Sequence, residues 1–226
     1  MARFDRLTVL NTVLHDGMVP LFYEANLERA QALAGALARG GSRVLEFTNR
    51  GDFAIEVFSG LVKWAAAEHP QLVIGVGSVD DAPTAALFLA HGANFVVGPT
   101  LVADLARLCN RRKVAYLPGC GSLNDIAAAE ELGVEIVKLV PGGAVGGPGF
   151  VRDVLGPRPW SRMMPTGGVT PDEDNLRAWF GAGVACVGMG SRLLRPDLIK
   201  AGDYDSIAGD TAAALAMIKR IRGPLD

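Results

Sequence analysis

Residues 71–99 read QLVIGVGSVDDAPTAALFLAHGANFVVGP, and this stretch decides the predicted fold. An apolar, β-branched run stands at each end, and a segment rich in alanine and leucine lies between them, at residues 80–92. A strand, a helix and a second strand in such short succession are typical of parallel strands joined by a crossover helix. The stretch therefore predicts one β–α–β unit.

The same alternation continues from this unit in both directions along the chain. Helix-like stretches, for example at 26–40 and 52–69, separate eight strand-like runs. These runs are MVPLFY (18–23), SRVLEFT (42–48), QLVIGVG (71–77), NFVVGP (94–99), VAYLPG (114–119), EIVKLV (135–140), RMMPTGG (162–168) and ACVGMG (185–190). Eight strand–helix units in about 200 residues are the number found in a (β/α)8 (TIM) barrel.

We therefore predict an α/β fold, a single-domain (β/α)8 TIM barrel that spans residues 1–226. Residues 1–17 are expected to form an extra N-terminal helix that closes the bottom of the barrel, and residues 210–223 the last outer helix. A doubly wound sheet is the competing fold. Its dinucleotide site needs GxGxxG, whereas GVGSVD at 75–80 supplies only GxG.

Composition narrows the class of protein further. The net charge is −2, and the Lys and Arg residues are scattered, so neither nucleic acid nor a membrane surface is an expected partner. No run reaches the roughly 18 apolar residues of a membrane span. The three cysteines lie far apart, without the spacing of a zinc site or a disulfide framework. We expect a cytoplasmic protein that acts on a small molecule.

One lysine, Lys138, interrupts the apolar run EIVKLV. Because side chains alternate along a strand, Val137 and Leu139 share the face toward the helices, and Lys138 points into the barrel. Burial disfavours the charged ammonium, so Lys138 either pairs with a buried carboxylate or becomes a neutral, nucleophilic amine. A lysine at a strand end, with its ammonium in solvent, is the third interpretation.

A second ionisable residue, Glu46, points inward from another strand by the same alternation, in RVLEFT (43–48). A buried carboxylate near a Schiff-base lysine can move protons during the reaction. A static ion pair between Lys138 and Glu46 is the alternative, although buried pairs contribute little net stability.

Two glycine-rich turns follow the last two predicted strands, TGGV at 166–169 and GMGS at 188–191. Phosphate sites in TIM barrels commonly use the loops after strands 7 and 8. Glycine lets backbone N–H groups approach an anion, and the hydroxyls of Thr166 and Ser191 add donors. Ordinary tight turns, which also use glycine, are the alternative.

Nine segments of the chain, in order, match one family across roughly residues 19–207. They are VPLFY, GGSRVLEFTNRG, IGVGSVDD, FVVGPTL, YLPGCGS, GVEIVKLVP, PTGGVTPDEDNL, CVGMGSRL and AGDYDSI. With these segments the chain resembles the 2-keto-3-deoxy-6-phosphogluconate (KDPG) / 4-hydroxy-2-oxoglutarate (KHG) aldolases. The resemblance implies a (β/α)8 barrel, a homotrimer, and a class I aldolase with no metal and no cofactor.

The resemblance also implies roles for individual residues. Lys138 and Pro141 match the family's K-x-x-P motif, so Lys138 would carry the covalent Schiff base. Glu46, Thr48 and Arg50 match its E-x-T-x-R motif. Glu46 would act as the proton carrier, and Arg50 would contact the carboxylate of the keto acid.

Further motifs assign the rest of the implied substrate site. Ser78 matches a position near the substrate carboxylate, while Pro99 and Thr166 match pocket-wall positions. The residues that match the family's phosphate cradle are Gly167, Gly168, Gly190 and Ser191.

The chain departs from the family pattern just after the lysine. Many members have aromatic residues there, followed by Pro-Ala-Glu or Pro-Ser. Here Leu139 and Val140 follow Lys138, and Gly142 and Gly143 follow the proline. The lysine chemistry is unaffected, but the smaller pocket wall leaves the identity of the substrate open.

The predicted function is a class I aldolase that cleaves a 2-keto-3-deoxy sugar acid to pyruvate and an aldehyde. The expected substrate is 6-phosphorylated, either KDPG or its galactonate epimer, and the aldehyde is then glyceraldehyde 3-phosphate. The alternatives are an aldolase for unphosphorylated 4-hydroxy-2-oxoglutarate-type substrates and a non-catalytic phosphosugar-binding barrel. A metal-dependent or isomerising phosphosugar barrel would need paired carboxylates at the strand ends, which the sequence does not show.

Overall fold

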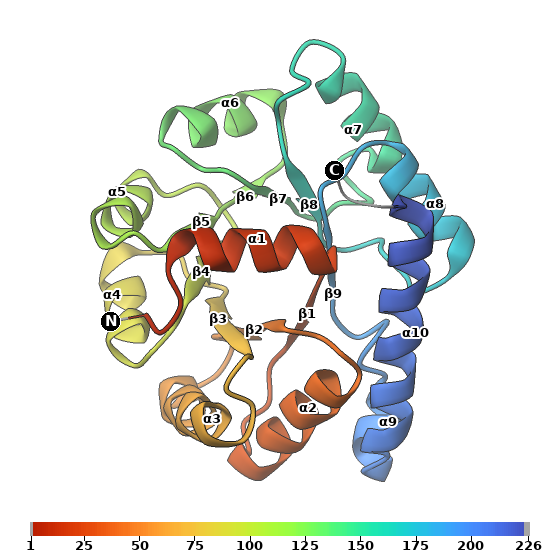
Figure 1. The fold of residues 1–226 in the computed structure, drawn as a ribbon. Helices are drawn as coiled ribbons and strands as arrows, with labels where there is room; N and C mark the ends of the chain where they lie inside the picture. The colour runs from red at the N-terminus through yellow and green to blue at the C-terminus, as the bar shows by residue number, and fades with distance from the viewer. Residues whose placement is uncertain (1, 224–226) are drawn as a thin grey trace.

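The computed structural model describes residues 2–223, so Met1 and residues 224–226 of the predicted domain lie outside the described residues. Figure 1 shows short strands at the centre, helices around them, and one helix, α1, lying across the strands. In chain order the elements are α1 (Arg6–Asp16), β1 (Met18–Phe22), α2 (Leu27–Arg39), β2 (Val44–Thr48), α3 (Ala54–Glu68), β3 (Val73–Gly77), α4 (Ala82–Ala90), β4 (Phe95–Val97), α5 (Ala103–Arg112), β5 (Ala115–Leu117), β6 (Gly119–Cys120), α6 (Leu123–Glu131), β7 (Val137–Leu139), α7 (Gly147–Leu155), β8 (Met163–Pro165), α8 (Glu173–Gly181), β9 (Val187–Met189), α9 (Pro196–Ala201) and α10 (Tyr204–Arg222).

All strand pairings are parallel, which confirms the predicted α/β class. The strands form a curled six-stranded sheet in the order β5-β4-β3-β2-β1-β9 and a three-stranded sheet in the order β6-β7-β8. A single parallel bridge, between Thr166 and Gly188, joins the end of β8 to β9. The structure thus differs from one continuous ring of eight strands.

The break between the two sheets falls inside the run at 114–119 that was predicted to be one strand. This prediction was wrong, because β5 pairs with β4, whereas β6 pairs with β7. Pro118 stands between the two short strands. Proline has no N–H group to donate to a neighbouring strand, so the ladder of hydrogen bonds is interrupted there.

Several helices differ from the prediction, and the short helix α9 was not predicted at all. The helix α7 was not predicted, because its sequence GPGFVRDVL begins with helix-breaking residues. The expected helix at 210–223 begins earlier, at Tyr204, where the side chain of Asp203 accepts a hydrogen bond from the Ser206 N–H group. The expected N-terminal helix is shorter, Arg6–Asp16, and its first turn is capped by Asp5.

The helix α1 fills the space between the amino ends of the strands. Its residues Val9, Leu10 and Val13 belong to a buried apolar cluster with inward-facing strand residues. The strand-side members are Val19, Val44, Val73, Phe95, Val97, Ala115, Leu117, Ile136, Met164 and Cys186. The amino end of the fold is therefore packed with apolar side chains.

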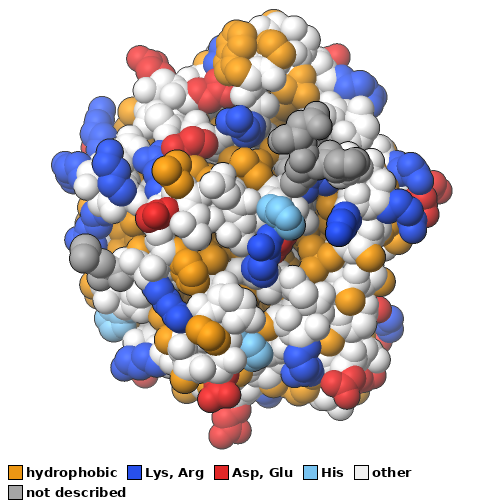
Figure 2. Space-filling model, viewed as in Figure 1, with side chains coloured by type: hydrophobic (Ala, Val, Ile, Leu, Met, Phe, Trp, Pro, Cys, Tyr) orange, Lys and Arg blue, Asp and Glu red, His pale blue; other side chains and the backbone are white. Residues whose placement is uncertain are grey.

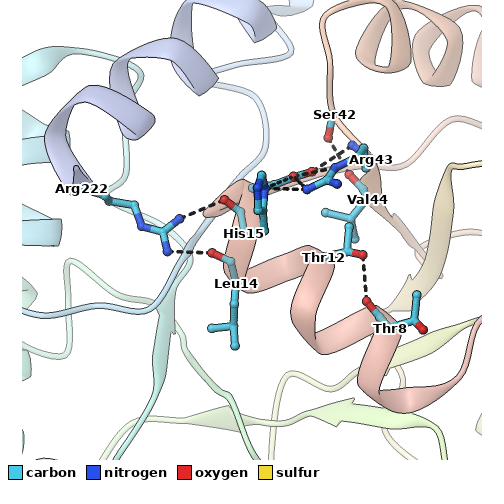
Figure 3. A network of polar contacts seen from close by, with 9 residues as sticks. Thr8, Thr12, Leu14, His15, Ser42, Arg43, Val44 and Arg222 are labelled. Atoms are coloured by element: carbon cyan, nitrogen blue, oxygen red, sulfur yellow. Dashed lines mark hydrogen bonds and ion pairs between the residues drawn. The ribbon is translucent and has the colours of Figure 1, made fainter. Parts of the chain in front are cut away.

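Polar contacts hold the end of α1 in place (Figure 3). The Arg43 backbone N–H and Nε donate to the Asp16 carboxylate at 3.0 and 2.9 Å. A guanidinium only donates, so the contact of 2.6 Å from Arg43 makes His15 Nδ1 the acceptor. From α10, Arg222 donates to the Leu14 carbonyl at 2.7 Å, which satisfies a C-terminal carbonyl of α1.

The other face of the strands packs on the outer helices. Leu45, Phe47, Val137 and Leu139 belong to the cluster that includes the apolar faces of these helices. The alternation predicted for β2 and β7 is confirmed, since Ile136 belongs to the inner cluster.

The surface over α1 is mixed in character. Figure 2 shows Lys, Arg, Asp and Glu side chains interspersed with apolar ones on the face that carries α1. Within residues 2–223, none of the helices has the length and apolar character that crossing a membrane would require.

Candidate active site

The structure brings Lys138 and Glu46 together inside the strands, although 92 positions separate them in the sequence. The Lys138 Nζ atom lies 3.1 Å from both carboxylate oxygens of Glu46. Only 8% of the lysine side chain and 1% of the glutamate side chain are exposed. A lysine whose ammonium reaches solvent at a strand end was therefore the wrong alternative.

The neighbouring strand makes room for this pair. The side chain of Glu46 extends over Gly77 of β3, where a Cβ atom would lie only 1.9 Å from Glu46 Oε1. Gly77 is paired in register with Thr48, two residues beyond Glu46. A glycine at position 77 is thus required for the carboxylate to reach Lys138.

Two buried threonine hydroxyls lie at this end of the strands without a protein partner. Neither Thr48 Oγ1 nor Thr166 Oγ1 forms a hydrogen bond within residues 2–223. Thr48 shares the inward face of β2 with Glu46, and Thr166 follows β8 directly. Because an unpaired buried hydroxyl costs free energy, both are suited to a polar group of a bound ligand.

Arg50 and Ser78 follow the carboxyl ends of neighbouring strands, β2 and β3. Arg50 Nε donates to Ser78 Oγ at 3.1 Å, and Arg50 is exposed to solvent. Ser78 has a positive φ of 58°, an uncommon value for a residue other than glycine. The two side chains form a donor pair that can hold a carboxylate at the open end of the strands.

The two glycine-rich turns also lie side by side, because the Thr166–Gly188 bridge joins them. Gly167 and Gly168 both have positive φ, 88° and 79°. The backbone of Gly142 and Gly143 runs along this turn and donates to the carbonyls of Thr166 and Gly167 at 2.9 and 3.0 Å.

The remaining predicted positions lie at the same end. Gly190 and Ser191 follow β9, and Pro99 follows β4 with its ring exposed. The backbone carbonyl of Pro99 approaches β6 so closely that a Cβ atom at Gly119 would lie 1.9 Å from it. Within residues 2–223, no hydrogen bond joins Pro99 to Lys138 or Glu46.

Other chemistry-bearing residues near the site have simpler roles. Burial raises the pKa of Cys120, on β6, to about 12, so its thiol stays protonated at neutral pH. Among residues 2–223 there is no group of three or more His, Cys, Asp or Glu side chains that could hold a metal ion.

Two residues that support the turn at 166–169 were not predicted from the sequence. Asn175 and Trp179, both on α8, donate to the Gly168 carbonyl at 3.1 and 3.3 Å. Asn175 lies within the family-matching segment PTGGVTPDEDNL, which was the only signal available from the sequence. Trp179 is buried, and its ring packs in the core while its indole N–H makes this contact.

Comparison with known proteins agrees with this geometry. Residues 9–209 match the model of the family described as KDPG and KHG aldolase. The chain belongs to the KDPG and KHG aldolase family. A relative within this family, the 2-dehydro-3-deoxy-phosphogluconate aldolase of Pseudoalteromonas atlantica, is 34% identical over 88% of this chain and 90% of its own length.

Two solved structures of KDPG aldolases share the fold. The Legionella pneumophila KDPG aldolase has a TM-score of 0.81 and 27% identity, over 90% of this chain and 97% of that chain. In that structure pyruvate is captured as a covalent carbinolamine intermediate. The Zymomonas mobilis KDPG aldolase with 3-phosphoglycerate has a TM-score of 0.79 and 27% identity, over 92% of this chain and 95% of that chain.

Proposed function

We propose that this protein is a class I aldolase that cleaves KDPG to pyruvate and glyceraldehyde 3-phosphate. The observation that carries the proposal is the buried pair of Lys138 and Glu46, with the amine 3.1 Å from both carboxylate oxygens. Membership of the family and the carbinolamine in its Legionella member support the same chemistry.

The contact between the two side chains accounts for the formation of a nucleophile. Transfer of one proton from the Lys138 ammonium to the Glu46 carboxylate gives a neutral amine without leaving a net charge in the site. The amine attacks C2 of the keto acid to form a carbinolamine. The hydroxyl of the carbinolamine takes the proton held by Glu46 and leaves as water, which forms an iminium ion and returns Glu46 to its carboxylate form. The iminium then acts as the electron acceptor for cleavage.

Cleavage and release use the same two residues. Glu46, as a carboxylate, removes the proton from the C4 hydroxyl, directly or through a water. The C3–C4 bond breaks, its electron pair forms an enamine with the iminium carbon, and the aldehyde leaves. Protonation of the enamine at C3 and hydrolysis of the iminium release pyruvate and restore the Lys138 amine.

Arg50 and Ser78 are proposed to hold the carboxylate of the keto acid. The hydrogen bond between them fixes the Arg50 guanidinium at the mouth of the site, and its remaining N–H groups are available for a bidentate contact. A fixed carboxylate holds the neighbouring C2 carbonyl against the Lys138 amine. Thr48 and Thr166, with their unpaired hydroxyls, are proposed to bind polar groups of the same substrate.

The phosphate is proposed to bind at the two glycine turns, Gly167–Gly168 and Gly190–Ser191. Within residues 2–223, the backbone N–H groups of these four residues donate to no other residue. Unpaired N–H groups on neighbouring glycine turns are suited to a phosphate. Pro99 remains a proposed wall residue of the pocket.

Three wider features belong to the same proposal. The two sheets and the Thr166–Gly188 bridge support a single (β/α)8 barrel domain in which Pro118 interrupts one strand. The homotrimer and the cytoplasmic location stay predictions from the sequence. The reaction proposed here needs no cofactor besides the covalent bond to Lys138.

Incubation with pyruvate, followed by borohydride reduction and intact mass measurement, tests the proposal. The expected result is one pyruvate-sized mass gain that maps to the peptide containing Lys138. Turnover of KDPG and of unphosphorylated 4-hydroxy-2-oxoglutarate is then measured by coupled detection of pyruvate. Folded protein that forms no adduct contradicts the class I mechanism. If an adduct forms but only the unphosphorylated substrate is turned over, the mechanism stands and the proposed substrate is wrong.

A further inference from the structure

The turn at residues 166–169 has its carbonyl groups held by two other segments of the chain. The Gly142 and Gly143 N–H groups donate to the carbonyls of Thr166 and Gly167 at 2.9 and 3.0 Å. The Gly168 carbonyl accepts from Asn175 Nδ2 at 3.1 Å and Trp179 Nε1 at 3.3 Å, both from α8. Three consecutive carbonyls are therefore fixed by residues outside the turn.

The fixed carbonyls determine where the N–H groups point. In a trans peptide the C=O and N–H of one unit point in opposite directions. The N–H groups of Gly167, Gly168 and Val169 consequently point away from the residues that hold the carbonyls. None of these N–H groups donates to another residue in the described chain. Three adjacent donors are thus held open in advance of ligand binding.

Asn175 is held rigidly enough to perform this task. Its own N–H group donates to the capping carboxylate of Asp172 at 2.9 Å, and its side-chain oxygen accepts from the Thr170 N–H group at 2.9 Å. The side-chain amide of Asn175 therefore contacts the backbone on both sides of Val169, at Gly168 and at Thr170. These two contacts determine its orientation. Trp179, one turn further along α8, is only 1% exposed and has a fixed indole position.

We propose that Asn175 and Trp179 are positioning residues that fix the Gly168–Val169 peptide, and with it the conformation of the 166–169 turn whose N–H groups are proposed to bind the substrate phosphate. They act through the Gly168–Val169 peptide and touch neither the substrate nor Lys138. This inference rests on the proposed phosphate site, and it deepens that proposal by assigning specificity for phosphorylated keto acids to two side chains of α8.

The experiment measures KM and kcat for KDPG and for its unphosphorylated counterpart, together with inhibition by inorganic phosphate. Asn175→Ala removes two hydrogen bonds and is expected to raise the KM of KDPG about tenfold more than that of the unphosphorylated substrate. Trp179→Phe removes one N–H donor and keeps most of the ring, so a shift of about threefold is expected. Inhibition by phosphate should weaken in parallel.

Matched controls come from the same residue types elsewhere. Asn124 lies in the first turn of α6 and is exposed, and Trp160 is 63% exposed near the start of β8. Asn124→Ala and Trp160→Phe are expected to leave the preference for the phosphorylated substrate unchanged.

The outcomes separate the inference from the proposed function. Wild-type protein that shows neither preference for KDPG nor inhibition by phosphate overturns the phosphate site itself. If Asn175→Ala and Trp179→Phe both keep the wild-type preference for KDPG over the unphosphorylated substrate, only the positioning role is overturned. Equal losses for both substrates, together with a lower melting temperature, would mean that the two side chains only stabilise the fold. Trp179→Phe keeps the test decisive should Asn175→Ala fail to fold.

Discussion

The amino and carboxyl ends of the strands are built in opposite ways. At the amino end, α1 closes the space with Val9, Leu10 and Val13, and the cluster around them is apolar. At the carboxyl end, a buried ion pair and two unpaired buried hydroxyls occupy the equivalent space. Apolar packing stabilises a fold, whereas unpaired polar groups cost stability unless a ligand satisfies them. One end is therefore arranged for stability and the other for chemistry.

The largest expected effect comes from removing the amine at the carboxyl end. Lys138→Ala should lower KDPG turnover on the order of 10⁴-fold or more and abolish the borohydride-trapped pyruvate adduct, because no other described lysine lies against Glu46. Adduct formation is followed by intact mass. The variant also leaves Glu46 buried without its partner, so thermal unfolding is recorded alongside. An adduct that persists in folded Lys138→Ala protein would assign the nucleophile elsewhere.

Glu46→Gln distinguishes the role of the carboxylate from the role of the Lys138 amine. The amide keeps the size of the side chain but cannot take up a proton, so turnover should fall about 10²- to 10⁴-fold. Trapping with pyruvate should still detect the iminium, although it forms more slowly. The measurement is single-turnover adduct formation beside steady-state turnover. A turnover rate equal to that of the wild type would remove Glu46 from the mechanism.

At the amino end, Leu10→Ala should affect stability and not chemistry. Leu10 is 7% exposed within the apolar cluster, and its truncation should cost about 2–4 kcal/mol of the free energy of unfolding in urea. Leu7, on the same helix, is 70% exposed, and Leu7→Ala should change stability by no more than about 0.5 kcal/mol. At urea concentrations below the unfolding transition, both variants should form the trapped pyruvate adduct to the same extent as the wild type. Loss of trapping in Leu10→Ala would show that the two ends are coupled.

Gly168→Ala tests the close approach of the two loops. Gly168 has a φ of 79°, and a Cβ atom there would lie 3.0 Å from the Gly143 Cα atom. Gly202 has a similar φ of 69° but no atom within 4 Å of such a Cβ, so it controls for backbone strain alone. Both alanine variants should lose about 1–2 kcal/mol of stability. Only Gly168→Ala should also raise the KM of KDPG, by about tenfold. Equal kinetics in the two variants would show that the loop contact is irrelevant to binding.

The sequence predicted the parts of the site that depend on local periodicity. The inward direction of Glu46 and Lys138 followed from the alternation of side chains along single strands. The contact between them did not, because it depends on which strands are brought together by the whole fold. An ion pair between the two side chains was one alternative from the residues alone, and the family motifs supplied their roles in the form of a resemblance.

Features that depend on contacts between distant backbone segments could not be predicted. The open N–H groups of the 167–169 turn exist because Gly142, Gly143 and α8 occupy the carbonyls. Neither spacing nor composition encodes such partners. The break at Pro118 is different, since the missing N–H was visible in the sequence and the run was still assigned as one strand.

The smallest expected effect comes from a thiol that is buried at the amino end of the strands. Burial raises the pKa of Cys186 to about 12, so the folded protein keeps a proton that the unfolded chain loses above about pH 8.5. The stability that this group contributes is complete below that pH and falls as pH rises toward the folded pKa, by about 1.4 kcal/mol per pH unit. Urea unfolding between pH 9 and 10 measures the slope, which should be shallower in Cys186→Ala by that amount. Equal slopes in the two proteins would mean that the amino end admits water to the thiol, and the apolar closure by α1 would then be looser than its packing indicates.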